Sequence, residues 1–315
     1  MKICSLLPGA TEVVAALGLA DQLVGISHEC DYPPDVRQHP VMVKAVIDQE
    51  RLSSPEIDTE VKAAVQRGQP LYELNREAFA LAEPDLVLTQ DLCHVCAVTP
   101  NQLQEAIASV STKPRVLSLN PTRMDDILSD IEHIGRATQH EAEARTFVSA
   151  LRARLASIHD RVSSVKTRPS VVCLEWVDPL YVAGHWVPEM VESAGGQNRL
   201  GRTGIPSYQV TWDQIETAAP DVLMLMPCGF SLERSVREAD RLATRPGWEG
   251  LPAVKQGNVF AVDASSYFSR PGPRLVDGVA ILAASFHPDV FGGTLPPGVQ
   301  RLAAYRPVPG TAGIA

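Results

Sequence analysis

The sequence lacks an excess of positive charge. Its 28 Lys and Arg residues are outnumbered by 37 Asp and Glu residues, which gives a formal net charge of −9. Proteins that bind nucleic acids need a basic surface for the phosphates, and the sequence contains no cluster of Lys or Arg. We therefore expect no nucleic-acid partner.

Long apolar runs and familiar catalytic motifs are also missing. No run approaches the roughly 18 apolar residues that a membrane span requires, so no membrane insertion is expected. The sequence contains no P-loop, no dinucleotide-binding fingerprint, no Gly-x-Ser-x-Gly and no Ser-x-x-Lys. No motif indicates a hydrolase or a kinase, and a binding protein is favoured over an enzyme.

The first residues do not have the pattern of a secretory signal. Met1-Lys2 leads directly into the apolar stretch 3–7, which is typical of a first strand, without a charged region, a longer apolar region or a cleavage site. We therefore expect a cytoplasmic protein, and a periplasmic one only if a leader had been removed.

The six cysteines are not spaced as in a small disulfide-stapled domain, and reduced thiols are the simpler interpretation. Cys4 and Cys173 lie inside apolar strands, where core packing is favoured. The other four cysteines lie at or near the ends of predicted strands.

One pattern occurs twice in the chain. Pro84-Asp85 and Pro220-Asp221 each precede an apolar strand that ends in a cysteine-containing loop. An acidic residue, Glu77 or Asp213, lies seven residues before each of these prolines. The repeat predicts two similar α/β lobes.

Between the two repeats, apolar residues recur at steps of three and four from Ala144 to Val165, which predicts one long amphipathic helix. We expect an α/β fold of two Rossmann-like lobes joined by this single helix. Because open α/β sheets bind ligands at the carboxyl ends of their strands, a ligand cleft between the lobes is expected.

Residues 44–72 are interpreted as a surface insertion. The predicted parts are an N-terminal lobe at 1–137, a linker helix at 138–167, a C-terminal lobe at 168–290 and a loosely ordered Pro/Gly-rich tail at 291–315.

The stretch Val87–Cys96 (VLTQDLCHVC) runs from an apolar strand into a Cys-x-x-Cys motif that also contains a histidine. Thiolate and imidazole groups at the fixed ends of strands suit zinc, Cu(I) or a cobalt centre. A single Cys-x-x-Cys is equally compatible with inert thiols, and a redox pair is a third interpretation. The candidate metal ligands are Cys30, Cys93, His94, Cys96 and Cys228.

Other residues near strand ends are candidate contacts to a small-molecule ligand. Trp176 could stack on a flat ligand or cover the core, and Gly184 before His185 permits a close approach of the backbone. Arg270 could clamp a carboxylate or phosphate, or form a structural salt bridge. The candidate ligand contacts are His28, Glu29, Gln90, Glu175, Trp176, His185, Tyr267, Phe268 and Arg270.

The order of these motifs resembles the helix-linked, or class III, substrate-binding proteins that serve ABC importers for cobalamin, haem and siderophores, and is most similar to the cobalamin-binding members. The resemblance covers about residues 2–290, excepting the 44–72 insertion. It rests on the long helix and on four motifs: Leu7-Pro8-Gly9-Ala10-Thr11-Glu12, Asp31-Tyr32-Pro33-Pro34, Pro84-Asp85-Leu86-Val87 and Phe268-Ser269-Arg270-Pro271-Gly272-Pro273-Arg274.

This resemblance implies a small-molecule ligand and an ABC permease as partner. It also implies that one acid on each lobe, here Glu77 and Asp213, docks onto arginines of the permease. The positions at which aromatic residues hold the corrin in cobalamin-binding members correspond here to Glu29, Gln90 and Ser207, so a corrin would meet thiols and imidazoles in this chain.

Two functions therefore stay open. The first is capture of cobalamin, another corrinoid or another metal-containing small molecule, without a catalytic step. The alternative is a cytoplasmic Cys/His metal-site protein that holds zinc or another thiophilic metal and acts as a metallochaperone, a sensor or a metalloenzyme.

Overall fold

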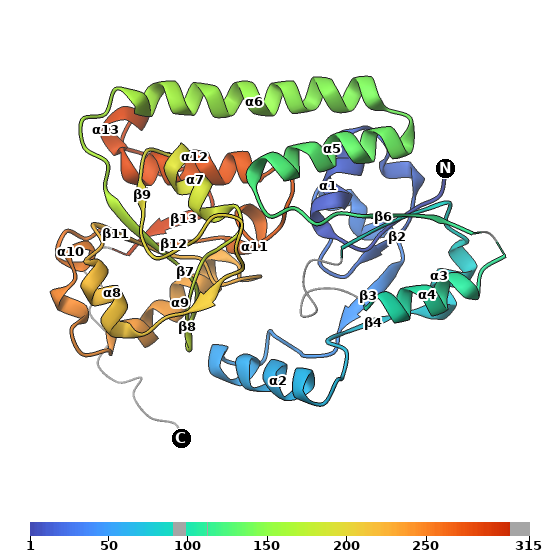
Figure 1. The fold of residues 1–315 in the computed structure, drawn as a ribbon, viewed down its shortest axis with the longest axis horizontal. Helices are drawn as coiled ribbons and strands as arrows, with labels where there is room; N and C mark the ends of the chain where they lie inside the picture. Colours follow the sequence, from blue (N-terminus) through green and yellow to red (C-terminus); the bar gives the residue numbers. More distant parts are fainter. Residues whose placement is uncertain (91–98, 112, 303–315) are drawn as a thin grey trace. The chain divides into compact units, whose positions relative to one another are not determined.

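The computed structural model describes residues 1–90, 99–111 and 113–302, and the chain divides into two compact units (Figure 1). Unit 1 consists of Met1–Arg152 together with Arg270–Pro273. Unit 2 consists of Ala153–Ser269 and the chain from Arg274 onward. Each unit contains one β-sheet and several helices, so the predicted fold of two α/β lobes is confirmed.

Unit 1 is built around a six-stranded sheet in the order β4-β3-β2-β1-β5-β6. Neighbouring strands are parallel, except that β4 runs antiparallel to β3. The strands are β1 (Ile3–Ser5), β2 (Leu23–Ser27), β3 (Val41–Ala45), β4 (Tyr72–Leu74), β5 (Leu86–Thr89) and β6 (Arg115–Ser118). The helices are α1 (Pro8–Ala16), α2 (Ser54–Gln66), α3 (Arg76–Ala82), α4 (Pro100–Ala108) and α5 (Met124–Thr138), with 3-10 turns η1 (Ala20–Gln22) and η2 (Pro34–Gln38).

The two central strands of this sheet are buried along their whole length. Every residue of β1 and β5 is buried, which explains why both strands are nearly continuous apolar runs in the sequence. Cys4 and Val87 from these strands pack in one cluster with Met42 and Phe79.

Unit 2 contains a seven-stranded sheet whose main path is β10-β8-β7-β11-β12-β13, with β9 paired to β7. β7, β11 and β12 are parallel, whereas β8, β10 and β13 run antiparallel to their neighbours. The strands are β7 (Ser170–Val177), β8 (Leu180–Val182), β9 (Gln197–Asn198), β10 (Tyr208–Gln209), β11 (Val222–Leu225), β12 (Val259–Val262) and β13 (Val299–Arg301). The helices are α7 (Val187–Ser193), α8 (Trp212–Ala218), α9 (Leu232–Ala243), α10 (Pro252–Lys255), α11 (Ala264–Tyr267), α12 (Leu275–Phe286) and α13 (Pro288–Phe291), with the 3-10 turn η3 (Trp248–Gly250).

The Pro-Asp repeat of the sequence makes the same contact in both units. The Asp85 carboxylate accepts a hydrogen bond from the backbone N–H of Lys2 at 2.7 Å. The Asp221 carboxylate accepts from the backbone N–H and the hydroxyl of Ser170 at 2.9 and 2.8 Å. Each aspartate thereby joins the start of one central strand to the start of its parallel neighbour, β5 to β1 and β11 to β7.

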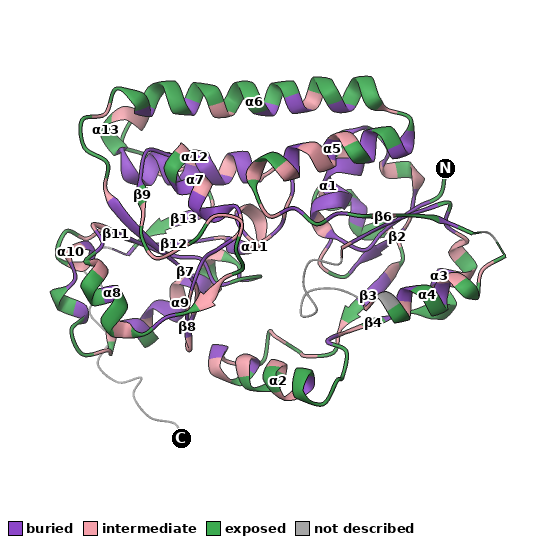
Figure 2. Cartoon of the chain, in the orientation of Figure 1, coloured by how far each residue is buried: buried purple, intermediate pink, exposed green. Residues whose placement is uncertain are grey.

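The predicted long helix is present as α6 (Glu141–Ser163), which begins in unit 1 and ends in unit 2. At 1.5 Å per residue it is about 35 Å long. The apolar stripe that predicted the helix forms its buried side, and the remaining positions are mostly exposed (Figure 2). The buried residues of the stripe are Ala144, Val148, Leu151, Ile158 and Val162.

Two segments differ from the sequence-based expectation. The predicted surface insertion at 44–72 includes the end of β3 and the start of β4, because a three-residue edge strand is too short to show an alternating pattern. The predicted loosely ordered tail contains β13, in which Val299 pairs with Val262 of β12. Short antiparallel edge strands thus account for both differences.

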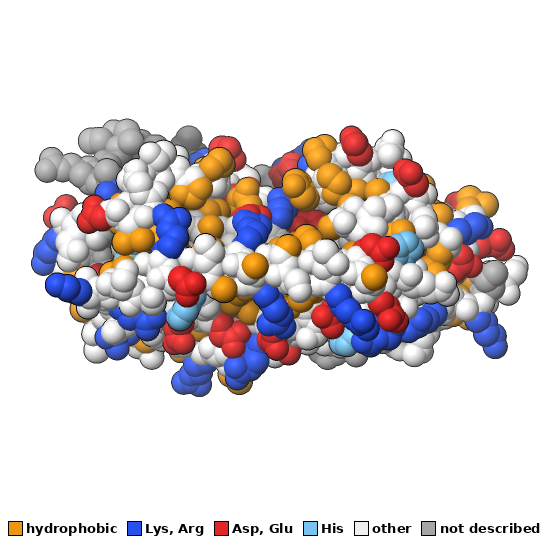
Figure 3. All heavy atoms as spheres, turned by 90° about the horizontal axis from the view of Figure 1, so that it is seen from above, with side chains coloured by type: hydrophobic (Ala, Val, Ile, Leu, Met, Phe, Trp, Pro, Cys, Tyr) orange, Lys and Arg blue, Asp and Glu red, His pale blue; other side chains and the backbone are white. Residues whose placement is uncertain are grey.

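Charged side chains of both signs are interspersed over the face shown in Figure 3, and Lys and Arg do not gather into one patch on that face. Such mixing gives no extended field of one sign there. Within the part of the chain that the structure describes, no helix is both long and apolar enough to span a membrane.

Candidate functional site

Four predicted site residues, three ligand contacts and one metal ligand, lie at one edge of the unit 1 sheet. Because β1, β2 and β5 are parallel, their carboxyl ends meet at this edge. His28, Glu29 and Cys30 directly follow β2, and Gln90 directly follows β5. This edge therefore carries an imidazole, a carboxylate, a thiol and an amide from the two strands that flank β1.

His28 is held by the backbone of the adjacent strand. Its backbone N–H donates to the carbonyl oxygen of Val43 at 3.0 Å, and its Nδ1 lies 3.0 Å from the same oxygen. The ring lies against Tyr72, with 6.0 Å between the ring centroids. Nε2 is 3.9 Å from Oε1 of Glu29, and the side chain is 30% exposed. The imidazole is thus fixed in position while one side of it stays accessible.

Cys30 is buried in a small hydrogen-bonded group. Its Sγ lies 3.0 Å from the hydroxyl oxygen of Thr11, which is also 2.8 Å from the hydroxyl of Ser5 and 3.0 Å from the carbonyl oxygen of Leu7. Burial raises the pKa of the Cys30 thiol to about 11. The thiolate is the form that ligates metals, so a metal that bound Cys30 would have to displace the thiol proton.

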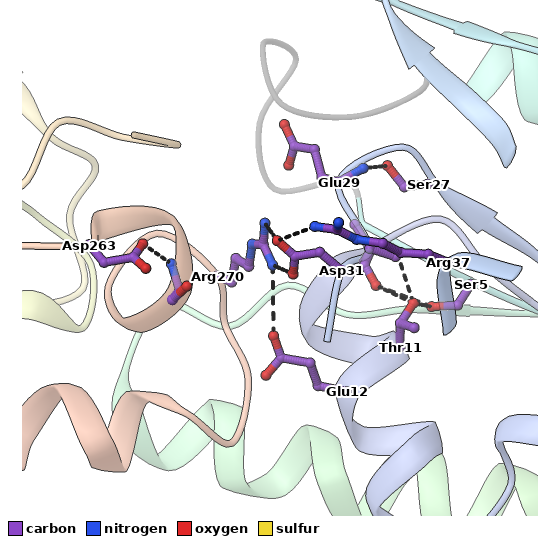
Figure 4. Close-up of polar contacts among 12 residues, drawn as sticks. Ser5, Thr11, Glu12, Ser27, Glu29, Asp31, Arg37, Asp263 and Arg270 are labelled. Atoms are coloured by element: carbon purple, nitrogen blue, oxygen red, sulfur yellow. Dashed lines mark hydrogen bonds and ion pairs between the residues drawn. The ribbon is translucent and has the colours of Figure 1, made fainter. Parts of the chain in front are cut away.

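Arg270 is the centre of a buried ionic group (Figure 4). Nη1 and Nη2 donate to the two carboxylate oxygens of Asp31 at 2.5 and 3.2 Å. Nη1 is also 3.9 Å from the carboxylate of Glu12, and the side chains of Arg270 and Glu12 are 8% and 4% exposed. Arg37 approaches Asp31 to 3.9 Å. The guanidinium group therefore faces carboxylates of the protein.

The short segment that carries Arg270 packs tightly on α1. A Cβ atom at Gly9 would lie 2.2 Å from the carbonyl oxygen of Pro271, so only glycine fits there. Residues 270–273 belong to unit 1 although the chain on both sides of them belongs to unit 2. These contacts favour the salt-bridge interpretation of Arg270 over a clamp on a ligand carboxylate or phosphate.

The loops after β7, β11 and β12 meet at one edge of the unit 2 sheet. Cys228, after β11, donates its backbone N–H to the carbonyl oxygen of Glu175 at 3.0 Å. The N–H of Gly229 donates to the hydroxyl of Ser269 at 3.1 Å. Glu175, Trp176 and Cys228 are thereby brought together as predicted strand-end residues, and the loop after β12 lies beside them.

Trp176 forms an aromatic surface at this edge. Its ring is tilted against Phe230 with 5.1 Å between centroids, and its Nε1–H donates to the carbonyl oxygen of Asp178 at 3.1 Å. Phe230 is buried, and the guanidinium carbon of Arg234 lies 3.7 Å from the centroid of its ring. Phe230 and Arg234 were not identified as site residues from the sequence. Their position between the end of a strand and the first turn of α9 could have indicated it.

His185 is not brought to the Trp176 edge. Because β8 runs antiparallel to β7 and Val182 pairs with Leu174, the chain after β8 runs away from the carboxyl end of β7. His185 has a positive φ of 48°, and its backbone N–H donates to the carbonyl oxygen of Ile205 at 2.7 Å. Burial lowers the pKa of its imidazole below the usual value.

The two aromatic residues before Arg270 differ in exposure. Tyr267 ends α11 and is partly buried, with the guanidinium carbon of Arg274 at 5.7 Å from its ring centroid. Phe268 is 3% exposed, and its carbonyl oxygen accepts a hydrogen bond from Nε1 of Trp186 at 2.8 Å. The Phe268 ring is part of the core of unit 2, which leaves Tyr267 as the aromatic contact candidate of this loop.

The metal-site hypothesis gains no support from the described part of the chain. Within it, no group of three or more His, Cys, Asp or Glu side chains is arranged to hold a metal ion. Cys93, His94 and Cys96 lie outside the described residues, and their role stays a prediction. Cys228 is exposed and not in a disulfide, whereas Cys4 and Cys173 are buried in their strands.

Glu77 and Asp213 have the same position in two corresponding helices. Each is the exposed second residue, of α3 and α8 respectively. Asn75 and Thr211 cap these helices by accepting the backbone N–H three residues further on, at 3.0 and 3.3 Å. The two acids are thus presented on equivalent, well-capped helical turns.

The two α/β units, the helix that runs from one to the other and the polar strand ends define a helix-linked, two-lobed binding protein. A family model described as periplasmic binding protein matches residues 3–265. The chain belongs to the periplasmic binding protein family. The predicted resemblance is confirmed, and this family binds solutes rather than catalysing reactions.

Known relatives cover most of the chain. The uncharacterized ABC transporter substrate-binding lipoprotein YvrC of Bacillus subtilis is 28% identical over 92% of this chain and 81% of its own length. The cobalamin-binding protein of Halobacterium salinarum is 28% identical over 91% of this chain and 69% of its own length. The solved periplasmic vitamin B12-binding protein BtuF of Vibrio cholerae has a TM-score of 0.64 at 21% identity, and the match covers 90% of this chain and 96% of that one.

The expectation of a cytoplasmic protein is wrong. Of the relatives that match over most of the chain, the one from Bacillus is named as a lipoprotein and the one from Vibrio as a periplasmic protein. The expectation rested only on the pattern of the first residues of the printed sequence.

We predict that Arg270→Leu lowers the free energy of unfolding by about 3–5 kcal/mol, because it removes the buried cation beside the Glu12 carboxylate and the bidentate partner of Asp31. Urea denaturation of the purified protein measures this change. Arg152→Leu is the matched control: it removes an exposed ion pair with Asp125 and should change stability by at most about 1 kcal/mol. Equal stability of the two variants would contradict the structural role of Arg270.

Proposed function

We propose that this protein captures a corrinoid, or a similar flat metal-containing small molecule, and delivers it to an ABC permease. The observation that carries the proposal is the aromatic surface formed by Trp176 on Phe230 at the strand-end edge of unit 2. Membership of a solute-binding family and the names of the relatives from Halobacterium and Vibrio support the same ligand class.

The geometry of Trp176 suits contact with a flat ligand. Its polar Nε1–H is already used by the carbonyl oxygen of Asp178, so the ring can meet an apolar surface without losing a hydrogen bond. The buried Phe230 supports it from one side. Polar groups suited to the amide substituents of such a ligand belong to the same strand-end loops, among them Glu175 and the Ser269 hydroxyl.

The relatives also support action outside the cytoplasm, as a lipoprotein or a periplasmic protein. The proposed function contains no chemical step. The protein binds the ligand, holds it and releases it to the transporter.

We predict that the protein binds cyanocobalamin with one-to-one stoichiometry and that Trp176→Ala weakens binding about tenfold. Loss of one aromatic contact costs about 1–2 kcal/mol, which corresponds to that factor. Equilibrium dialysis measures the affinity, with hemin as a second ligand.

Trp176→Phe keeps a flat ring and should retain most of the affinity. Trp212→Phe is the control, because Trp212 lies on α8 and donates its Nε1–H to the carbonyl oxygen of Pro246. Unchanged affinity in Trp176→Ala would refute the role of this surface. Failure of the wild type to bind either cyanocobalamin or hemin would refute the ligand class.

We further propose that Glu77 and Asp213 dock onto basic side chains of the permease. Both are exposed, and each follows the capped start of its helix by one residue. Complementary charges steer association and fix the orientation of the partners, so two acids on corresponding helices suit a permease with corresponding basic sites.

We predict that Glu77→Lys and Asp213→Lys abolish the stimulation of permease ATPase activity by the loaded protein while cyanocobalamin affinity stays unchanged. The measurement uses the permease complex reconstituted in vesicles. Glu73→Lys, an exposed charge reversal on β4, is the control and should stimulate normally. Full stimulation by both docking variants would rule out this docking mode.

A further inference from the structure

The hydrogen bonding of His28 fixes which of its ring nitrogens carries a proton. Nδ1 lies 3.0 Å from the carbonyl oxygen of Val43, and a carbonyl oxygen only accepts hydrogen bonds. Nδ1 therefore carries the hydrogen, and in the neutral ring the lone pair resides on Nε2. This arrangement, with Nδ1–H bound to a backbone carbonyl, orients a histidine that ligates a metal through Nε2.

Nε2 itself makes no hydrogen bond with its charged neighbour among the described residues. That neighbour is Oε1 of Glu29 at 3.9 Å, which is beyond hydrogen-bond distance. The side chain is 30% exposed and directly follows β2, at the edge where the strand ends of unit 1 meet. The ring is held against Tyr72, so its direction is set before any ligand arrives.

A second histidine has the same kind of hydrogen bond from Nδ1 to a backbone carbonyl, but it lies away from the strand ends. Nδ1 of His140 lies 2.8 Å from the carbonyl oxygen of Thr138, in the turn between α5 and α6. His140 is therefore a matched reference: it has the same fixed tautomer and no place at a strand-end edge.

We propose that Nε2 of His28 coordinates the metal centre of the bound ligand as an axial ligand. This inference rests on the proposed function and narrows it to ligands whose metal has an exchangeable axial position. With hydroxocobalamin, the bond from cobalt to its water or hydroxide ligand breaks, a bond from cobalt to Nε2 forms, and water is released. A bound hydroxide takes up one proton from solvent, and the oxidation state of cobalt does not change.

The variant that isolates this role is His28→Asn. The Asn amide nitrogen corresponds in position to Nδ1, so it retains the hydrogen bond to Val43, whereas the Nε2 lone pair is removed. His28→Ala removes both. His140→Asn repeats the exchange at the reference histidine.

The test is an absorbance titration of hydroxocobalamin, in parallel with equilibrium dialysis of cyanocobalamin, whose axial cyanide resists replacement. For the wild type we expect the hydroxocobalamin spectrum to shift to that of an imidazole-ligated cobalt. His28→Asn and His28→Ala should bind hydroxocobalamin about tenfold or more weakly and leave its spectrum unshifted. Both should lose less affinity for cyanocobalamin than for hydroxocobalamin, because only hydroxocobalamin can exchange its axial ligand for Nε2, and His140→Asn should behave like the wild type with both ligands.

The outcomes separate this inference from the proposed function. If the wild type binds both cobalamins without a spectral shift, or if His28→Asn shifts the spectrum as the wild type does, coordination by His28 is refuted and corrinoid capture stands. If the wild type has no measurable affinity for cyanocobalamin, hydroxocobalamin or hemin, the proposed function is refuted and the inference with it.

Discussion

The parallel pairing of the central strands is the constraint on which both candidate binding edges depend. Asp85 and Asp221 each bind the start of the neighbouring strand, which aligns β5 with β1 and β11 with β7. Strands aligned in this way end together, so their polar end residues gather at one edge. His28 and Glu29 lie at the edge of unit 1, and Trp176 lies at the edge of unit 2. The ligand chemistry proposed here follows from that alignment.

Local patterns in the sequence were sufficient to predict the main elements. Strands buried on both faces are continuous apolar runs, and the buried stripe of α6, from Ala144 to Val162, has the spacing of a helix. The residues in the loops after such strands, including Glu29 and Cys228, could therefore be identified as strand-end residues from the sequence. The repeat of Pro-Asp before each strand is likewise a local signal, and it corresponds to one repeated contact.

Contacts between distant residues could not be predicted in the same way. Arg270 pairs with Asp31, 239 positions away, and nothing local distinguishes this partner from a ligand carboxylate. His185 was predicted at a strand end as a ligand contact, but the three-residue strand β8 runs antiparallel to β7 and carries His185 away from the edge that holds Trp176. The support of Trp176 by Phe230 also depends on two strands that end together. The cytoplasmic location was wrong because it was inferred from the first residues and not from the fold.

The central claim is that the loops at the carboxyl ends of the strands hold the ligand. Hydrogen–deuterium exchange with and without cyanocobalamin tests it directly. The account predicts slower exchange on ligand binding in residues 27–31, 175–178, 228–231 and 263–269, with little change in α3 and α8. Slower exchange confined to other parts of the chain, with no change in these loops, would contradict it.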